Sequence, residues 1–242
     1  MDWKMVAAGG VIALVAGSLV HTGLQHRFVE MRRRYVDVLR AIRAPMLPIA
    51  LVAVAMVIAV SGLLMQVPIL RWGWWQAIGG SGNVVVGQSE YPGIGWRIAA
   101  FAIPLAVVLL LPALALFEEN SYRRGSESET WAERLRRQLM FGLMHLAAGI
   151  PIAIGLALTV AGLMFMWAYL REFNRLGAPE PPSLVLAHTA AGAQGYLTSD
   201  REARDARRQA QDVAVNHAAA LHTVYNALLL IPFVAVLAVS VL

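Results

Sequence analysis

Two adjacent glutamates at the end of an apolar segment are the first residues in this sequence that could do chemistry. Glu118 and Glu119 follow an uncharged stretch, residues 98–117, and Arg123 comes four positions after Glu119. An acidic pair at a helix end can simply meet water, but ionisable side chains inside a membrane are costly and indicate function by default. The arginine should keep Glu119 ionised, which leaves Glu118 as the carboxylate free to act as a base.

Two histidines lie in other apolar segments. His145 ends the stretch FGLMH, four positions after Phe141, and His222 begins HTVYN, which ends at Asn226. A spacing of four places both members of each pair on one face of a helix. Taken singly, each motif is also explained by polar side chains that hydrogen-bond between membrane helices.

Together the three motifs form an ordered set: EENSYR at 118–123, FGLMH at 141–145 and HTVYN at 222–226. Each short motif is weak alone, but the ordered set on membrane segments is more specific. The set resembles the CPBP family, the CAAX protease and bacteriocin-processing (abortive-infection) proteins, which include the type II CAAX prenyl endopeptidases. The resemblance covers about residues 101–230 and implies an intramembrane endopeptidase.

The resemblance also implies roles for individual residues. Glu118, helped by His145, would activate a water molecule, and His222 with Asn226 would hold the substrate carbonyl as an oxyanion hole. Glu119 and Arg123 of the first motif would form a supporting ion pair. The site residues implied in this way are Glu118, Glu119, Arg123, His145, His222 and Asn226.

Three other interpretations of these residues stay open. His145, His222 and Glu118 could bind zinc with Glu119 as base, although no HExxH motif is present. We favour a site without metal or other cofactor, because Asn226 is a poor zinc ligand but a good oxyanion donor. Alternatively, the two histidines could ligate haem b, or the chain could be a non-catalytic immunity or partner-binding protein. With no cysteine and no Ser or Thr beside a local base, a covalent nucleophile is not expected.

The elements that must position these residues are membrane helices. The chain of 242 residues is 58% hydrophobic and 14% charged, with a mean hydropathy of +0.59. Its uncharged runs cover residues 5–20, 44–70, 98–117, 138–170 and 213–242. Because about 20 apolar residues span a bilayer and a spanning backbone must satisfy its own hydrogen bonds, we expect an all-α, polytopic transmembrane helix bundle. About five to seven membrane segments are predicted.

Arginines predict how the bundle is oriented. Residues 27–43 carry Arg27, Arg32, Arg33, Arg34, Arg40 and Arg43. The positive-inside rule places this segment, expected as an interfacial helix, in the cytoplasm and the N-terminus outside. Helices are then expected at about residues 6–24, 46–66 and 96–117, with the first retained and not cleaved. Trp72, Trp74 and Trp75 lie outside as an interfacial aromatic belt.

The run 138–170 is too long for one ordinary span and short for two. We expect a hairpin that breaks at residues 149–151, Gly-Ile-Pro, because this places His145 and His222 at the same depth near the cytoplasmic face. A single long kinked helix is the competing interpretation. Residues 171–212, rich in proline and arginine, look like an inserted segment whose second half is a solvated helix, before a last span at about 213–242.

The chain divides into two predicted parts. Residues 1–95 hold the N-terminal helices, the basic loop and the external tryptophan loop, and residues 96–242 hold the catalytic bundle with its insertion at 171–212. The net charge of +5 reflects membrane topology, so no nucleic acid is expected as a partner. The expected partners are the bilayer and a peptide or membrane-protein substrate, and the expected location is a bacterial cytoplasmic membrane.

Overall fold

The computed structural model shows an all-α membrane protein. It describes residues 3–80, 82–86, 93–177 and 193–241 of the chain. The structure is 85% helical, has no strand among the described residues, and has five helices long and apolar enough to cross a membrane. The predicted polytopic helix bundle is confirmed, at the lower end of the expected number of membrane segments.

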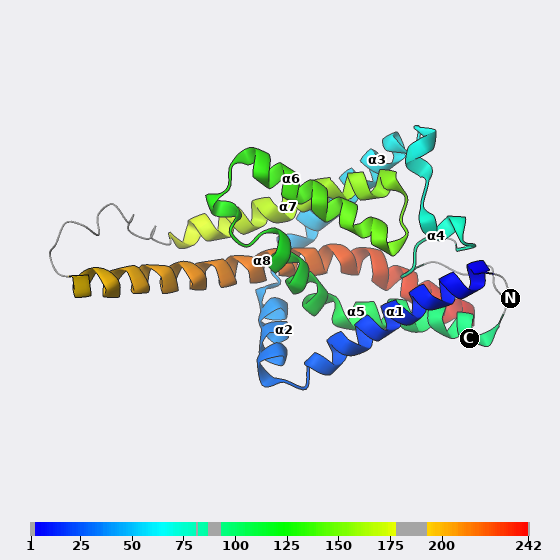
Figure 1. Ribbon diagram of the computed structural model, residues 1–242, viewed down its shortest axis with the longest axis horizontal. Helices are drawn as coiled ribbons and strands as arrows, with labels where there is room; N and C mark the ends of the chain where they lie inside the picture. Colours follow the sequence, from blue (N-terminus) through cyan, green and yellow to red (C-terminus); the bar gives the residue numbers. More distant parts are fainter. Residues whose placement is uncertain (1–2, 81, 87–92, 178–192, 242) are drawn as a thin grey trace.

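Eight α-helices and three short 3₁₀ helices follow one another along the described chain (Figure 1). They are α1 (Trp3–Gln25), α2 (Val29–Ala41), α3 (Met46–Leu64), η1 (Pro68–Arg71), α4 (Trp74–Ala77), α5 (Ile94–Tyr122), η2 (Ser126–Ser128), α6 (Trp131–Met144), η3 (His145–Ala148), α7 (Ile152–Leu176) and α8 (Ala193–Val241). The candidate spans lie in α1, α3, α5, α7 and α8, whereas α6 is too short and too polar at its start to be one.

The centre of the bundle is α8, against which α3, α5 and α7 all pack. Helix α7 also packs against α3 and α6, while α1 packs mainly along α5. Small residues dominate the α7–α8 contact, with Ala157 and Ala161 on α7 and Ala214 and Ala218 on α8 all fully buried. Such residues let helix backbones approach closely, and close packing drives association in lipid, where the hydrophobic effect between helices is missing.

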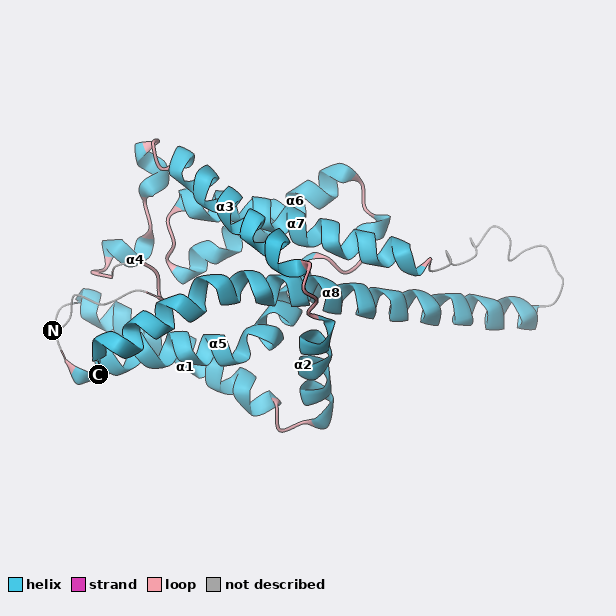
Figure 2. Cartoon of the chain, turned by 180° about the vertical axis from the view of Figure 1, so that it is seen from behind, coloured by secondary structure: helices cyan, strands magenta, loops and turns pink. Residues whose placement is uncertain are grey.

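The bundle has two different ends. At the arginine end, where α1 ends and where α3 and α6 begin, α2 lies across the other helices (Figures 1 and 2). At the tryptophan end, where α4 lies, α1 begins and α8 finishes (Figure 1). Since α2 carries several arginines and also packs against α5 and α8, it has the character expected of an interfacial helix.

The expected hairpin between residues 138 and 170 is present as α6 with η3, followed by an antiparallel α7. The chain reverses at Gly149, which has a φ of 78° and ends η3, and Pro151 precedes the first turn of α7. Positive φ favours glycine, and proline suits a helix start. The two helices touch at Gly142, where an added Cβ would lie 2.3 Å from the carbonyl oxygen of Gly155.

The start of α6 is fixed by a capping box. The backbone N–H and the hydroxyl of Thr130 both donate to the Glu133 carboxylate at 2.8 Å. Together these hydrogen bonds hold the pKa of Glu133 below its ordinary value, with the backbone N–H making the larger contribution. The cap therefore sets where the chain turns back into the bundle after α5.

The expected end of the third helix at residue 117 is wrong, because α5 continues to Tyr122. The extra turn carries both glutamates inside the helix, where Asn120 and Ser121 donate back to the carbonyls of Leu116 and Phe117 at 2.9 Å. Tertiary partners of the glutamates, which no local pattern shows, keep this polar turn helical. Pro104 and Pro112 are accommodated inside the helix.

The last helix is also longer than expected. Instead of beginning near residue 213, α8 is one continuous helix from Ala193, and its first part projects beyond the arginine end (Figures 1 and 2). Of the predicted insertion 171–212, the structure describes the end of α7 and the start of α8, and residues 178–192 lie outside the described part. Arg207 and Gln211 tie α8 to Glu127 at 3.0 and 2.7 Å.

The tryptophan loop is only partly an exposed belt. Trp72 is exposed, but Trp75 is 2% exposed and packs against Gly149, while Trp74 Nε1 donates to the carbonyl of Leu146 at 2.6 Å. For Trp75, the predicted interfacial role is therefore wrong. The side chain fills the space beside the hairpin turn and so fastens this loop to the end of α6 and η3.

Candidate active site

All six predicted site residues lie in one region of the bundle, between α5, the junction of α6 with η3, and α8. Helix α5 carries Glu118, Glu119 and Arg123, the α6–η3 junction carries His145, and α8 carries His222 and Asn226. The three motifs, which are far apart in sequence, are brought together because α5, the hairpin and α8 pack on each other.

Glu119 and Arg123 form a buried ion pair on α5. Both side chains are 0% exposed, and Arg123 Nε lies 3.2 Å from Glu119 Oε2. The guanidinium also lies over the ring of Phe141, 4.0 Å from its centroid, and its Nη2 donates to the carbonyl of Gly162 at 3.5 Å. These contacts from α5 to the hairpin compensate the charges in a place that water does not reach.

His222 is held from two sides. Its Nδ1 lies 2.8 Å from Glu119 Oε1, so the ring nitrogen donates and the carboxylate accepts. Its ring stacks on Phe165 of α7, with centroids 4.4 Å apart and planes 20° apart. The hydrogen bond fixes which nitrogen carries a proton, and the stacking fixes the ring plane. Together they direct Nε2 toward Glu118.

Glu118 faces both histidines. Its Oε2 lies 3.8 Å from Nε2 of His145 and 3.8 Å from Nε2 of His222. His145 is oriented in the same manner as His222, because its Nδ1 donates to the carbonyl of Phe141 at 2.8 Å. The Glu118 Oε2 atom is buried and accepts no hydrogen bond from any described residue. A distance of 3.8 Å is too long for a direct hydrogen bond, and the Glu118 side chain is 20% exposed where it lines the neighbouring cavity.

An apolar cavity of about 590 Å³ adjoins these groups. Glu118, His145 and His222 form its polar wall together with Asn226 and Tyr225. The remaining wall consists mainly of aliphatic side chains from α1, α5, α7 and α8 and reaches the loop at residues 83–86. The site therefore combines a few convergent polar groups with a largely apolar pocket, as is common for small-molecule and substrate sites.

The geometry bears on the two cofactor alternatives. Among the described residues, no group of three His, Asp or Glu side chains is arranged to hold a metal ion. Zinc ligands lie about 2.0–2.2 Å from the ion and therefore about 3.3–3.6 Å from one another in a tetrahedral site, which is close to the 3.8 Å between Glu118 Oε2 and each histidine. For haem, the Glu118 carboxylate lies beside the Nε2 atoms of both histidines, in the space that a haem bound between them would need.

Some residues of the site were not predicted. The hydrogen bond between Glu119 and His222, the stacking of Phe165 and the presence of Tyr225 on the cavity wall had no sequence signal beyond helical spacing from known motif residues. Tyr225, for example, lies three positions after His222 and so shares its helix face. Phe165 belongs to α7, which carries none of the three motifs.

No family model, curated protein or solved structure matches this chain. The resemblance to the CPBP family therefore remains a prediction carried by the three motifs. What the structure establishes is the class of protein: an integral membrane helix bundle with carboxylates and histidines gathered beside an apolar cavity.

Proposed function

We propose that the protein is an intramembrane endopeptidase of the CPBP type, which hydrolyses peptide bonds with a water molecule activated by glutamate and histidine. The observation that carries this proposal is the position of Glu118 Oε2, buried and 3.8 Å from Nε2 of both His145 and His222. The Glu118 side chain is 20% exposed on the cavity wall, so its carboxylate can bind a water molecule there beside the two imidazoles, and the cavity can admit a substrate chain.

In the proposed reaction, Glu118 accepts a proton from the water, whose oxygen attacks the carbonyl carbon of the scissile peptide bond. The carbonyl electron pair moves to its oxygen, and Asn226 on the cavity wall donates a hydrogen bond to that oxyanion. When the intermediate collapses, the C–N bond breaks and Glu118 returns its proton to the leaving amine. His145 assists by holding the water and the Glu118 carboxylate in line.

His222 can be the second oxyanion donor only in its doubly protonated form. Its Nδ1 is committed to Glu119, so a proton on Nε2 makes the ring a cation. The ionised Glu119 would neutralise that charge, and Arg123 would in turn balance Glu119. The pair Glu119–Arg123 thus supports His222 without touching the substrate. Tyr225, also on the cavity wall, offers a further hydroxyl donor.

For orientation, we infer that the arginine end faces the cytoplasm, as the positive-inside rule indicates for α2 and for the segment between α5 and α6. The catalytic groups then lie toward the cytoplasmic side of the membrane. Substrates would be peptide segments or membrane proteins that reach the apolar cavity, in a bacterial cytoplasmic membrane.

The competing proposal is a non-catalytic immunity or partner-binding protein. It is favoured by the internal network of Glu119, Arg123 and His222, whose polar groups join α5 to α8 and the hairpin and would stabilise helix packing in any protein. This network does not account for Glu118, whose Oε2 accepts no hydrogen bond from a described residue.

The test is cleavage of a diverse peptide library by the purified full-length protein, followed by mass spectrometry. Wild type is compared with Glu118→Gln and with the matched control Glu202→Gln, which changes an exposed carboxylate on the projecting part of α8. Each protein is assayed with and without a strong chelator.

We expect products from wild type and the control in chelator, and none from Glu118→Gln. Activity that chelator removes and zinc restores would replace the proposed mechanism with a metal-dependent one. Equal cleavage by wild type and Glu118→Gln would refute the role of this carboxylate. Absence of products from wild type as well would favour the non-catalytic proposal.

A further inference from the structure

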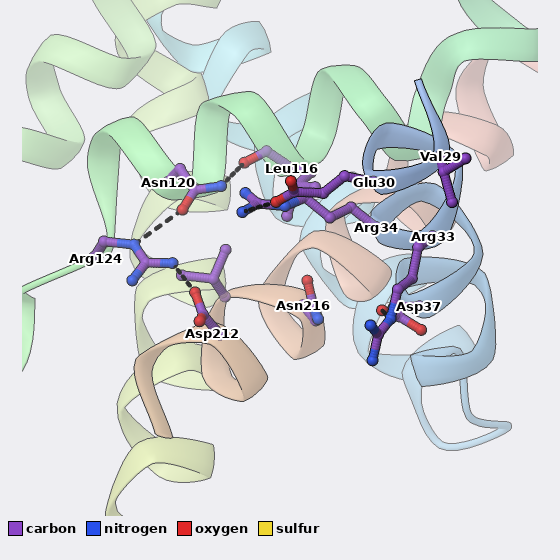
Figure 3. Close-up of a pocket in the computed structure, with 11 residues that line it drawn as sticks. Val29, Glu30, Arg33, Arg34, Asp37, Leu116, Asn120, Arg124, Asp212 and Asn216 are labelled. Carbon is purple, nitrogen blue, oxygen red and sulfur yellow. Dashed lines mark hydrogen bonds and ion pairs between the residues drawn. The ribbon is translucent and has the colours of Figure 1, made fainter. Parts of the chain in front are cut away.

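A second pocket lies on the opposite side of α5 from the candidate active site, between α2, α5 and α8 (Figure 3). Its volume is about 650 Å³. Leu116 and Asn120 line it from α5, where a spacing of four puts them on one helix face, and Arg124 lines it from just beyond the end of α5. Glu118 lies on the wall of the other cavity, so the two pockets share a helix but no lining residue.

Equal numbers of opposite charges line this second pocket. The cations are Arg33, Arg34 and Arg124, and the anions are Glu30, Asp37 and Asp212. Figure 3 shows Arg124 and Asp212 at one end and Arg33 with Asp37 at the other, with Asn216 between them. A ligand matched to this wall would carry both a negative and a positive group.

The ion pairs inside the pocket leave donors and acceptors available. Arg33 is 82% exposed, and its contact with Asp37 is 4.0 Å long, beyond hydrogen-bond distance. Arg34 donates one N–H to Glu30 at 2.8 Å and keeps the other donors of its guanidinium. Because exposed pairs of this kind contribute little to stability, a ligand can replace them without disturbing the fold.

The pocket also lies where lipid headgroups are expected. Helix α2 crosses the arginine end of the bundle (Figure 1), and Tyr35 anchors it by donating to the carbonyl of Leu109 in α5 at 2.9 Å. Val29, Leu116 and Val215 add apolar surface to the charged wall. A headgroup bound there could keep its acyl chains against the apolar flank of α5.

We propose that this pocket binds the headgroup of a phospholipid that carries a phosphate and a primary ammonium group. Arg33 and Arg34 bind the phosphate oxygens. The ammonium donates to Asp212 and Glu30, whose carboxylates also accept from Arg124 and Arg34. Charge-assisted hydrogen bonds of both signs give the site its selectivity. A quaternary ammonium has no N–H to donate and is usually recognised by aromatic side chains, none of which line the described pocket.

The experiment measures lipid binding to the purified, delipidated full-length protein in detergent by native mass spectrometry, so it does not depend on any peptidase activity. The probes are phosphatidylethanolamine, phosphatidylcholine and phosphatidylglycerol with the same acyl chains, and free phosphoethanolamine and inorganic phosphate as soluble arms. The variant is Arg33→Gln/Arg34→Gln. The matched control is Arg32→Gln/Arg40→Gln, which removes the same charge from α2 without changing a residue that lines this pocket.

Phosphatidylethanolamine should bind wild type about tenfold more tightly than phosphatidylcholine, and the pocket variant should lose this preference while the control keeps it. Tighter binding of phosphatidylglycerol, or equal binding of all three lipids, would overturn the proposal in favour of a general basic surface. Equal loss in both double variants would do the same. If free phosphoethanolamine or phosphate bound as tightly as the lipid, a soluble phosphate compound would be the ligand and the lipid assignment would be wrong.

Discussion

The buried charge network at the candidate site can be tested through stability, without knowing a substrate. In Glu119→Gln the carboxylate becomes neutral, but the amide oxygen can still accept from Nδ1 of His222. Arg123 then stays 0% exposed, with the carbonyl of Gly162 at 3.5 Å and the rings of Phe141, Phe165 and Tyr122 as its remaining neutral contacts. Leaving one charge of a buried pair uncompensated costs about 3–5 kcal/mol.

We therefore expect the free energy of unfolding of Glu119→Gln to fall by about 3–5 kcal/mol. Adding Arg123→Met removes the uncompensated charge and should recover on the order of 2 kcal/mol relative to the sum of the single variants. The measurement is helical circular dichroism during titration of detergent-solubilised protein with sodium dodecyl sulfate, analysed as a double-variant cycle.

The control is Arg33→Gln, which removes an exposed charge whose acidic neighbour lies 4.0 Å away. It should change the free energy of unfolding by less than about 0.5 kcal/mol. If Glu119→Gln were as stable as this control and the two single variants were additive, Glu119 and Arg123 would not form the buried pair. The positioning of His222 by Glu119 would then also be wrong.

Four further predictions concern packing and the site. Gly142→Ala should cost about 1–3 kcal/mol in unfolding free energy, because the new Cβ meets a backbone carbonyl of α7 at 2.3 Å. Gly17→Ala, with nothing within 4 Å, should be neutral or stabilising by up to about 1 kcal/mol in the same titration. Tyr169→Phe should lose about 1.5–3 kcal/mol, since its hydroxyl donates to Glu127 at 2.7 Å, and an unchanged unfolding curve would contradict that bond. Tyr225→Phe should unfold like wild type but lower peptide cleavage about 10²-fold if its hydroxyl binds the oxyanion, and unchanged cleavage would exclude this role.

Much of the architecture could be predicted because membrane helices are specified by local composition. Each of the five candidate spans overlaps one of the uncharged runs, and the hairpin turn falls at Gly149 and Pro151, where glycine and proline mark a break. The sequence also predicts that His145 and His222 lie at one depth, since a hairpin reverses the direction from which α8 enters the bundle.

The ends of helices were harder to predict, because tertiary contacts decide them. Helix α5 continues past the last apolar residue since Glu119 finds Arg123 and His222 inside the bundle. The polar start of α8 is helical beyond the bundle, and Glu127, buried between Tyr169 and Arg207, joins it to η2. Arg123 follows from the i,i+4 spacing with Glu119, but the other partners lie on other segments, and no spacing rule within one segment contains them.

The motifs also did not show which side chains contact one another within the site. A motif gives the residues of one helix face, but the ring that stacks on His222 comes from α7, and the ring beneath Arg123 comes from α6. Phe165 looks like an ordinary core residue in the sequence, and Phe141, although it belongs to the FGLMH motif, gives no sign there that it lies under Arg123. Their role in orienting polar groups depends on how the hairpin packs against α5 and α8.

The adjacency of Glu118 and Glu119 now has a physical explanation. Consecutive residues on an α-helix point about 100° apart, so two neighbouring carboxylates cannot share one environment. Glu119 points into the helix interface, where Arg123 and His222 hold it, while Glu118 points toward the cavity, where its Oε2 meets only the edges of two imidazoles. One turn of helix thus supplies both the fixed charge that orients a histidine and the unbound carboxylate that could use it. Moving either glutamate by one position would lose one of these two functions.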